Sequence, residues 1–245
     1  MPGALRESRH SGEVQHSENA SIQSIAASGG NGRYAGRSEL LLRLRQGPVL
    51  FGPGVSRYIL PMQHAEIPFF PPAKSRTHEV CGAGAYVFAF ALAARLASHT
   101  IWVRENWDNT QINPTGFADF VEPSVLTVCN TGKHTETLAV AEEALRSGAV
   151  SLVVMSLNQP LGLTEGRRLQ LAARDGRSTG LAIIPEGMGS NAAETRWRCI
   201  PVFDPKDSTL QKWELIKNKS GTLGVWHVRW ETASRRITMV SPARE

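Results

Sequence analysis

The chain has 245 residues, of which 41% are hydrophobic and 20% are charged, and its net charge is +5. This length allows one sizeable domain with a tail but not two large domains. No apolar run approaches the ~20 residues that a membrane helix requires, and no apolar stretch follows the basic residues near the N-terminus, so we expect a cytoplasmic protein without a secretory signal.

The first part of the chain is poor in large apolar side chains. Residues 1–37 are rich in Ser, Gly, Asn, Glu and His, a composition that predicts a disordered tail. Residues 38–46 begin with a cap-like Ser and carry a short amphipathic repeat, which predicts a helix that ends before Gly47 and Pro48. Frequent Pro and Gly predict an ordered loop up to residue 76. We therefore expect one domain over residues 38–245, in which residues 38–76 are a helix and loop lead-in.

From Thr77 onwards, short apolar segments alternate with helical patterns. Strands separated by helices favour a mainly parallel sheet that helices cover on both faces. The predicted elements are strand His78–Cys81, helix Ala85–Ala97, strand Ile101–Arg104, a short helix near Pro114–Phe120, strand Val125–Cys129, a helix of about Thr135–Arg146, strand Val150–Ser156, helix Thr164–Arg174 with Thr164 as its cap, and strand Gly180–Pro185.

After Thr195 the pattern predicts strands alone, which we expect to form an antiparallel extension of the α/β core. The predicted strands are Thr195–Phe203, Trp213–Asn218, Val225–Trp230 and Ile237–Val240, with a hairpin turn over residues 219–224. Four tryptophans lie in these strands: Trp197, Trp213, Trp226 and Trp230. Exposed tryptophans could stack on bases, but residues 226, 228 and 230 share one strand face, which is typical of a half-buried strand.

The first predicted strand leads into a glycine turn formed by Gly82 and Gly84. A phosphate-binding loop at this place needs Gly-x-x-x-x-Gly-Lys-Ser/Thr, whose Lys holds phosphate and whose hydroxyl holds magnesium. Here neither the Lys nor the Ser or Thr follows, and Tyr86 and Phe88 occupy the segment instead. The turn could belong to a dinucleotide site with Glu105 as ribose partner, but the third glycine of that motif is missing. A tight strand-to-helix turn is the simpler interpretation.

Six segments in order resemble ImuA, the RecA-like protein family of bacterial inducible-mutagenesis cassettes. They are His78-Glu-Val, Phe90-Ala-Leu-Ala-Ala-Arg-Leu, Glu142-Glu-Ala-Leu-Arg-Ser-Gly-Ala, Arg167-Arg-Leu-Gln-Leu-Ala-Ala, Thr195-Arg-Trp-Arg and Trp213-Glu-Leu-Ile-Lys-Asn-Lys. The resemblance implies a RecA-like core with a degenerate nucleotide-binding loop. RecA ends its Walker B strand with an Asp that holds magnesium through water, whereas the corresponding segment here reads Met155-Ser156-Leu157. Glu105 and Asn106 compete for the place of RecA's catalytic Glu.

The resemblance implies a non-catalytic accessory protein of damage-inducible translesion DNA synthesis, with no cofactor. Its implied partners are a Y-family-like polymerase protein and an error-prone replicative-type polymerase subunit. The second interpretation is an inhibitor of cell division that resembles SulA. SulA also resembles a RecA core that lacks the ATP-binding residues. An active P-loop ATPase is the third, because the Lys and the hydroxyl that its chemistry needs are missing after the glycine turn. No nucleophile–base pair can be identified in the sequence either.

Positive charge marks the candidate contact residues. Residues 196–245 hold 10 Lys or Arg against 5 Asp or Glu, so the whole net charge lies in this part of the chain. A basic segment favours an anionic partner such as single-stranded DNA or an acidic protein surface. The candidates for DNA or partner contact are Arg167, Arg168, Arg174, Arg177, Lys217, Lys219, Arg235 and Arg236, together with a glycine-containing loop at residues 186–192.

The cysteines and histidines suggest no metal site. Cys81, Cys129 and Cys199 are widely spaced in apolar segments, which favours reduced, buried thiols in a cytosolic protein. The histidines are scattered without a metal-binding spacing.

Overall fold

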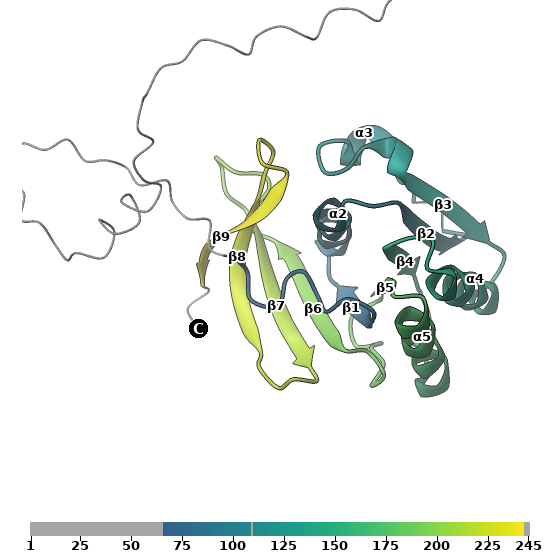
Figure 1. Ribbon diagram of the computed structural model, residues 1–245. Helices are drawn as coiled ribbons and strands as arrows, with labels where there is room; N and C mark the ends of the chain where they lie inside the picture. The colour runs from purple at the N-terminus through teal and green to yellow at the C-terminus, as the bar shows by residue number, and fades with distance from the viewer. Residues whose placement is uncertain (1–65, 109, 243–245) are drawn as a thin grey trace, which may run out of the picture. The chain divides into compact units, whose positions relative to one another are not determined.

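The computed structural model describes residues 66–108 and 110–242, and within them the strands form one sheet in the order β3-β2-β4-β5-β1-β6-β7-β8-β9 (Figure 1). The elements are β1 (Thr77–Cys81), α2 (Ala85–Leu96), β2 (Thr100–Glu105), α3 (Pro114–Phe117), the 3-10 helix η2 (Pro123–Val125), β3 (Leu126–Thr131), α4 (His134–Ser147), β4 (Leu152–Ser156), α5 (Leu163–Asp175), β5 (Thr179–Ile183), β6 (Thr195–Pro201), β7 (Gln211–Asn218), β8 (Gly224–Glu231) and β9 (Arg236–Pro242).

The predicted combination of a mostly parallel sheet with antiparallel C-terminal strands is confirmed. Strands β1 to β5 pair only in parallel with one another, whereas β7, β8 and β9 are antiparallel to their neighbours. The prediction for β6 was wrong in part, because β6 is antiparallel to β7 but parallel to β1. The connection over residues 184–194 contains no helix, so the sequence pattern did not reveal that it is a crossover between parallel strands.

The two faces of the sheet carry two separate cores. Helices α2 and α3 lie on one face and α4 and α5 on the other (Figure 1). Because side chains alternate along a strand, Trp102 packs beneath α2 while its neighbour Val103 packs beneath α4 and α5. The C-terminal tryptophans belong to the first core: Trp197 and Trp213 are 0% exposed, as a half-buried sheet predicts.

The sheet is not covered evenly. Strand β3 is an outer strand of the sheet, and Val128 at its middle is 40% exposed. Full cover on both faces, expected for all the strands of the parallel part, is therefore wrong at this edge. At the opposite edge lies β9, which within the described residues pairs only with β8.

Most predicted boundaries agree with the structure within two residues. The predicted cap Thr164 is wrong: α5 begins at Leu163, and Gly162 is the residue before the helix. The first C-terminal strand ends at Pro201, before the 91% exposed Phe203. The predicted tail at 1–37, the helix at 38–46 and the loop as far as residue 65 lie outside the described residues.

Candidate functional site

The glycine turn after β1 packs directly against β6. Gly82 has a φ of +89°, and a Cβ at this residue would lie 2.5 Å from the carbonyl oxygen of Cys199. A Cβ on Gly84 would lie 2.6 Å from Oε1 of Gln211 and 3.0 Å from the same carbonyl oxygen. The glycines are therefore required by the close approach of the turn to a neighbouring backbone.

The donors of this turn are used inside the protein. The Gly84 N–H donates to the Cys199 carbonyl at 2.8 Å, and the Ala85 N–H donates to the Gly82 carbonyl at 3.0 Å. A phosphate cradle depends on successive backbone N–H groups that point at the ligand. Here two of the corresponding groups already have partners.

Aromatic side chains fill the first turns of α2. Tyr86 stacks on Trp102 with a centroid distance of 5.4 Å, and Phe88 is 0% exposed between Trp197 and Trp213. These residues follow the glycine turn where a phosphate-binding loop carries its Lys and hydroxyl. They contribute to the core and supply no charge.

The end of β4 lacks a carboxylate as well. Ser156 is buried, and its Oγ accepts a hydrogen bond from Nε1 of Trp102 at 2.9 Å. The next residue, Leu157, is 2% exposed and its N–H donates to the Ile183 carbonyl at 2.9 Å. The side chains and backbone of Ser156 and Leu157 are therefore used for packing and for hydrogen bonds within the protein.

Glu105 and Asn106 differ clearly in their surroundings. Glu105 is 3% exposed, and its Oε2 accepts a hydrogen bond from Nε1 of Trp107. Its Oε1 lies 3.7 Å from Nδ1 of His134, and neither atom has a hydrogen-bond partner among the described residues. Asn106 is exposed. In the sheet, β2 is separated from β1 by β4 and β5, so this carboxylate is remote from the glycine turn. It lies instead beside His134, the first residue of α4.

The predicted loop at residues 186–192 is held by buried charge. The Glu79 carboxylate, 1% exposed, accepts hydrogen bonds from the Ser190 N–H at 2.8 Å and from Nε of Arg196 at 2.7 Å. The side chain of Gln170 on α5 donates to the Ala192 carbonyl at 3.0 Å. These bonds fix the crossover between β5 and β6 over β1.

Two of the predicted contact residues support the same loop. Lys217 donates to the carbonyls of Ser190, Asn191 and Ala193 at 3.1, 3.0 and 2.6 Å. Its pKa is lowered, first by desolvation and then by the nearby Arg196. Lys219 donates to the Ala192 carbonyl at 2.8 Å. Both ammonium groups thus have a structural role that the sequence did not indicate.

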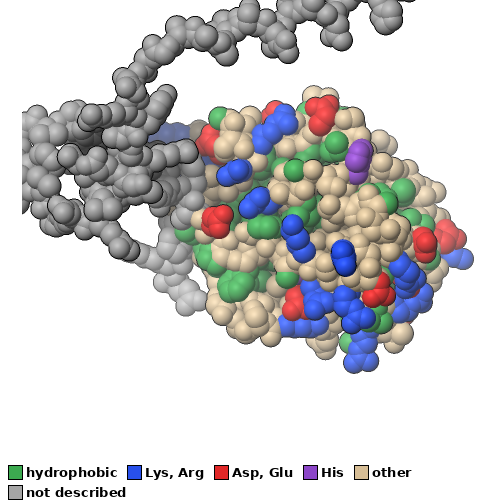
Figure 2. All heavy atoms as spheres, in the orientation of Figure 1, with side chains coloured by type: hydrophobic (Ala, Val, Ile, Leu, Met, Phe, Trp, Pro, Cys, Tyr) green, Lys and Arg blue, Asp and Glu red, His purple; other side chains and the backbone are tan. Residues whose placement is uncertain are grey.

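The arginines on and after α5 are exposed. Figure 2 shows blue side chains gathered over the region of α5. The four candidates of this region are all exposed: Arg167, Arg168, Arg174 and Arg177. Arg168 pairs with Glu142 on α4 at 2.6 Å, and that carboxylate also accepts from Arg146 at 2.7 Å. The surface is basic but partly neutralised by the acids of α4.

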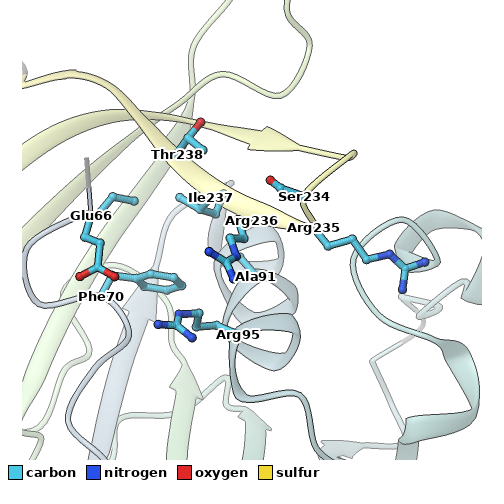
Figure 3. Close-up of a pocket in the computed structure, with 10 residues that line it drawn as sticks. Glu66, Phe70, Ala91, Arg95, Ser234, Arg235, Arg236, Ile237 and Thr238 are labelled. Carbon is cyan, nitrogen blue, oxygen red and sulfur yellow. The ribbon is translucent and has the colours of Figure 1, made fainter. Parts of the chain in front are cut away.

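The remaining two candidates line a pocket between α2 and β9. Arg235 and Arg236 are among its lining residues, as are Arg95 from the last turn of α2 and Phe70 (Figure 3). The sequence analysis missed Arg95 and Phe70. A basic residue in the last turn of a helix is common because it complements the helix dipole, so Arg95 carried no separate signal.

The described residues form no cluster of three His, Cys, Asp or Glu side chains that could hold a metal ion. Cys81, Cys129 and Cys199 are free thiols, and burial raises the pKa of Cys81 and, more strongly, of Cys199. His78 is fully buried, and desolvation lowers its pKa to about 4. Its Nε2 donates to the Ala73 carbonyl at 2.8 Å, so its Nδ1 accepts from the Thr195 hydroxyl at 2.7 Å.

No helix within the described ranges is long and apolar enough to cross a membrane. No protein-family model matches the chain, and comparison with curated proteins gives no significant match.

Proposed function

We propose that this chain is a non-catalytic, RecA-like accessory protein of damage-inducible translesion DNA synthesis. It acts in the cytoplasm as a scaffold for a Y-family-like polymerase protein and an error-prone replicative-type polymerase subunit. The proposal takes its biological setting from the resemblance of the sequence to the ImuA family, and its non-catalytic character from the geometry after β1.

The observation that carries the proposal is the contact between the glycine turn and β6. The Gly84 N–H bonds the Cys199 carbonyl at 2.8 Å, and the residues after the turn are core aromatics. Phosphoryl transfer requires donors and cations placed on the phosphates and a metal ion between them. None of the residues 82–88 supplies a cation, and Met155–Leu157 supply no carboxylate. A scaffold needs neither.

Nucleotide chemistry is tested by steady-state phosphate release from ATP, with and without single-stranded DNA. We expect no turnover above that of a heat-denatured sample. ATP hydrolysis that co-elutes with the folded protein in gel filtration contradicts the non-catalytic role.

The scaffold role is tested by co-expression with the two proposed partners, the Y-family-like polymerase protein and the error-prone replicative-type polymerase subunit. We expect both to co-purify with the chain and a strain lacking this gene to lose damage-induced mutagenesis. Capture of a cell-division protein instead, with division arrest on overexpression, supports the SulA-like interpretation and contradicts ours.

A further inference from the structure

The pocket between α2 and β9 has the size of one side chain. Its volume is about 130 Å³. An apolar cavity of about 150 Å³ is known to hold a benzene ring. The pocket is thus large enough for one aromatic or branched apolar side chain and too small for a nucleotide.

Its inner wall is apolar and fixed. The Phe70 ring lies 5.4 Å from that of Phe88 and 5.1 Å from that of Trp213, so the core holds it from behind. Ile67 and Ala91 are 4% and 2% exposed beside it. Side chains that the core already orders lose little further freedom when a ligand binds.

Its rim is positively charged. In Figure 3 the side chains of Arg95 and Arg236 lie beside Phe70, whereas that of Arg235 extends away from it. All three arginines are exposed, and within residues 66–108 and 110–242 none of them forms a salt bridge. Arg196 and Arg198 on β6, by contrast, pair with Glu79 and Glu214. Glu66 is the one acid among the lining residues.

The neighbouring strand can bind extended backbone. In the described part of the chain, β9 pairs only with β8, so its second edge presents backbone N–H and C=O groups without strand partners. A peptide that adds to such an edge gains main-chain hydrogen bonds, and pockets that receive alternate side chains give specificity.

We propose that this pocket and the outer edge of β9 bind an acidic, extended segment of a protein partner. One apolar side chain of the segment enters the pocket against Phe70, and a neighbouring carboxylate binds Arg95 and Arg236. The inference rests on the proposed scaffold function, for which it names the docking surface and the chemistry of the partner.

The test selects a random 12-residue phage-displayed peptide library on the folded full chain. We expect enrichment of sequences with Asp or Glu within two positions of a Phe, Leu or Ile. The double variant R95E/R236E should lose these sequences. The control R167E/R168E, which also reverses two exposed arginines but on α5, should keep them.

The most enriched peptide is then synthesised and its affinity measured by fluorescence anisotropy. We expect a loss of about tenfold or more in R95E/R236E, because reversed charges repel the carboxylate, and less than about twofold in the control. Hydrogen exchange of the β9 amides should slow when the peptide binds. If the double reversal does not fold, R95Q and R236Q replace it, with smaller losses expected.

Three results overturn the inference: enrichment of peptides without acids, equal affinity for the pocket variant, or unchanged exchange in β9. If fluorescein-labelled dT15 competes with the peptide, and R95E/R236E no longer binds dT15, the surface binds nucleic acid instead. Polymerase partners that bind R95E/R236E normally refute this docking site and leave the proposed function intact. If an acidic peptide is selected but the chain binds neither polymerase partner, the proposed function is refuted and the docking site stands.

Discussion

Two turns of this sheet use their polar groups in opposite ways. The turn between β1 and α2 lies at the carboxyl end of a central parallel strand, where α/β proteins commonly bind ligands, yet its Gly84 N–H bonds the β6 backbone. The turn between β8 and β9 lies outside the parallel part. Its last residue Arg235, and Arg236 at the start of β9, are exposed on a pocket. Fold topology alone would have pointed to the first turn, so the site has to be inferred from the residues.

The largest expected effect concerns the closed turn. Gly82→Ala places a Cβ 2.5 Å from the Cys199 carbonyl oxygen at a φ of +89°, so we expect a loss of about 3–5 kcal/mol in the free energy of unfolding. Gly187→Ala is the matched control, because its φ of +80° carries the same strain but nothing lies within 4 Å. It should lose about 1–2 kcal/mol. Equal losses in urea denaturation would show that the turn does not pack tightly on β6.

The second expected effect depends on pH and on the lead-in to β1. His78 has a pKa of about 4 in the folded protein against 6.5 when exposed, so only the unfolded chain takes up a proton in the interval between them. Stability should therefore fall as the pH is lowered from 6.5 to 4, by up to about 3 kcal/mol from this residue. The pH dependence of the unfolding free energy should flatten in His78→Gln and stay unchanged in His99→Gln, which replaces an exposed histidine.

A proton titration of the ring by NMR checks the same point directly. A His78 resonance that titrates near pH 6.5 would mean that the ring is solvated, and the link between residue 73, β1 and β6 through its two nitrogens would be wrong.

The third effect separates a buried ion pair from a surface one. Arg196→Met leaves the Glu79 carboxylate, 1% exposed, without its cation. We expect a loss of about 2 kcal/mol, below that of a fully buried pair because Arg196 keeps 20% of its side chain exposed. Arg168→Met leaves Glu142 its second partner Arg146 and should cost less than about 1 kcal/mol. Limited proteolysis within residues 184–194 should accelerate only in the first variant.

The parallel part of the fold was predictable because its signals are local. Apolar strands such as Leu152–Ser156 and helix patterns such as His134–Ser147 can be recognised within a few residues. The neighbour of β6 was not predictable, since pairing with β1 joins segments more than a hundred residues apart through a connection without a helix. The glycine turn was recognised, but its contact with the Cys199 carbonyl depends on that same pairing.

The charged residues were harder to interpret than the apolar ones. The sequence shows how many arginines and lysines lie after Thr195 but not which of them have partners. Lys217 has three backbone carbonyls and Arg198 has Glu214, whereas Arg236 lines the pocket. Whether a cation is used internally depends on which strands are adjacent, and Arg95 joined the pocket only through the packing of α2 against β9.

The smallest expected effect concerns the open turn. Arg235 has a φ of 49°, a left-handed conformation that costs a non-glycine residue about 1–2 kcal/mol. Arg235→Gly removes this strain, partly offset by the greater freedom of glycine in the unfolded chain, so we expect a gain of about 0.5–1 kcal/mol. Arg177→Gly, with a φ of 55°, is a control for the backbone effect away from the pocket. Because the Arg235 side chain extends away from Phe70 (Figure 3), its loss should leave the affinity of the selected peptide within about twofold. Two results would contradict this prediction: a destabilised Arg235→Gly variant, or a variant that loses peptide binding as fully as R236Q. Either result would mean that the arginine side chain holds the turn, and the contrast with the closed glycine turn would then fail.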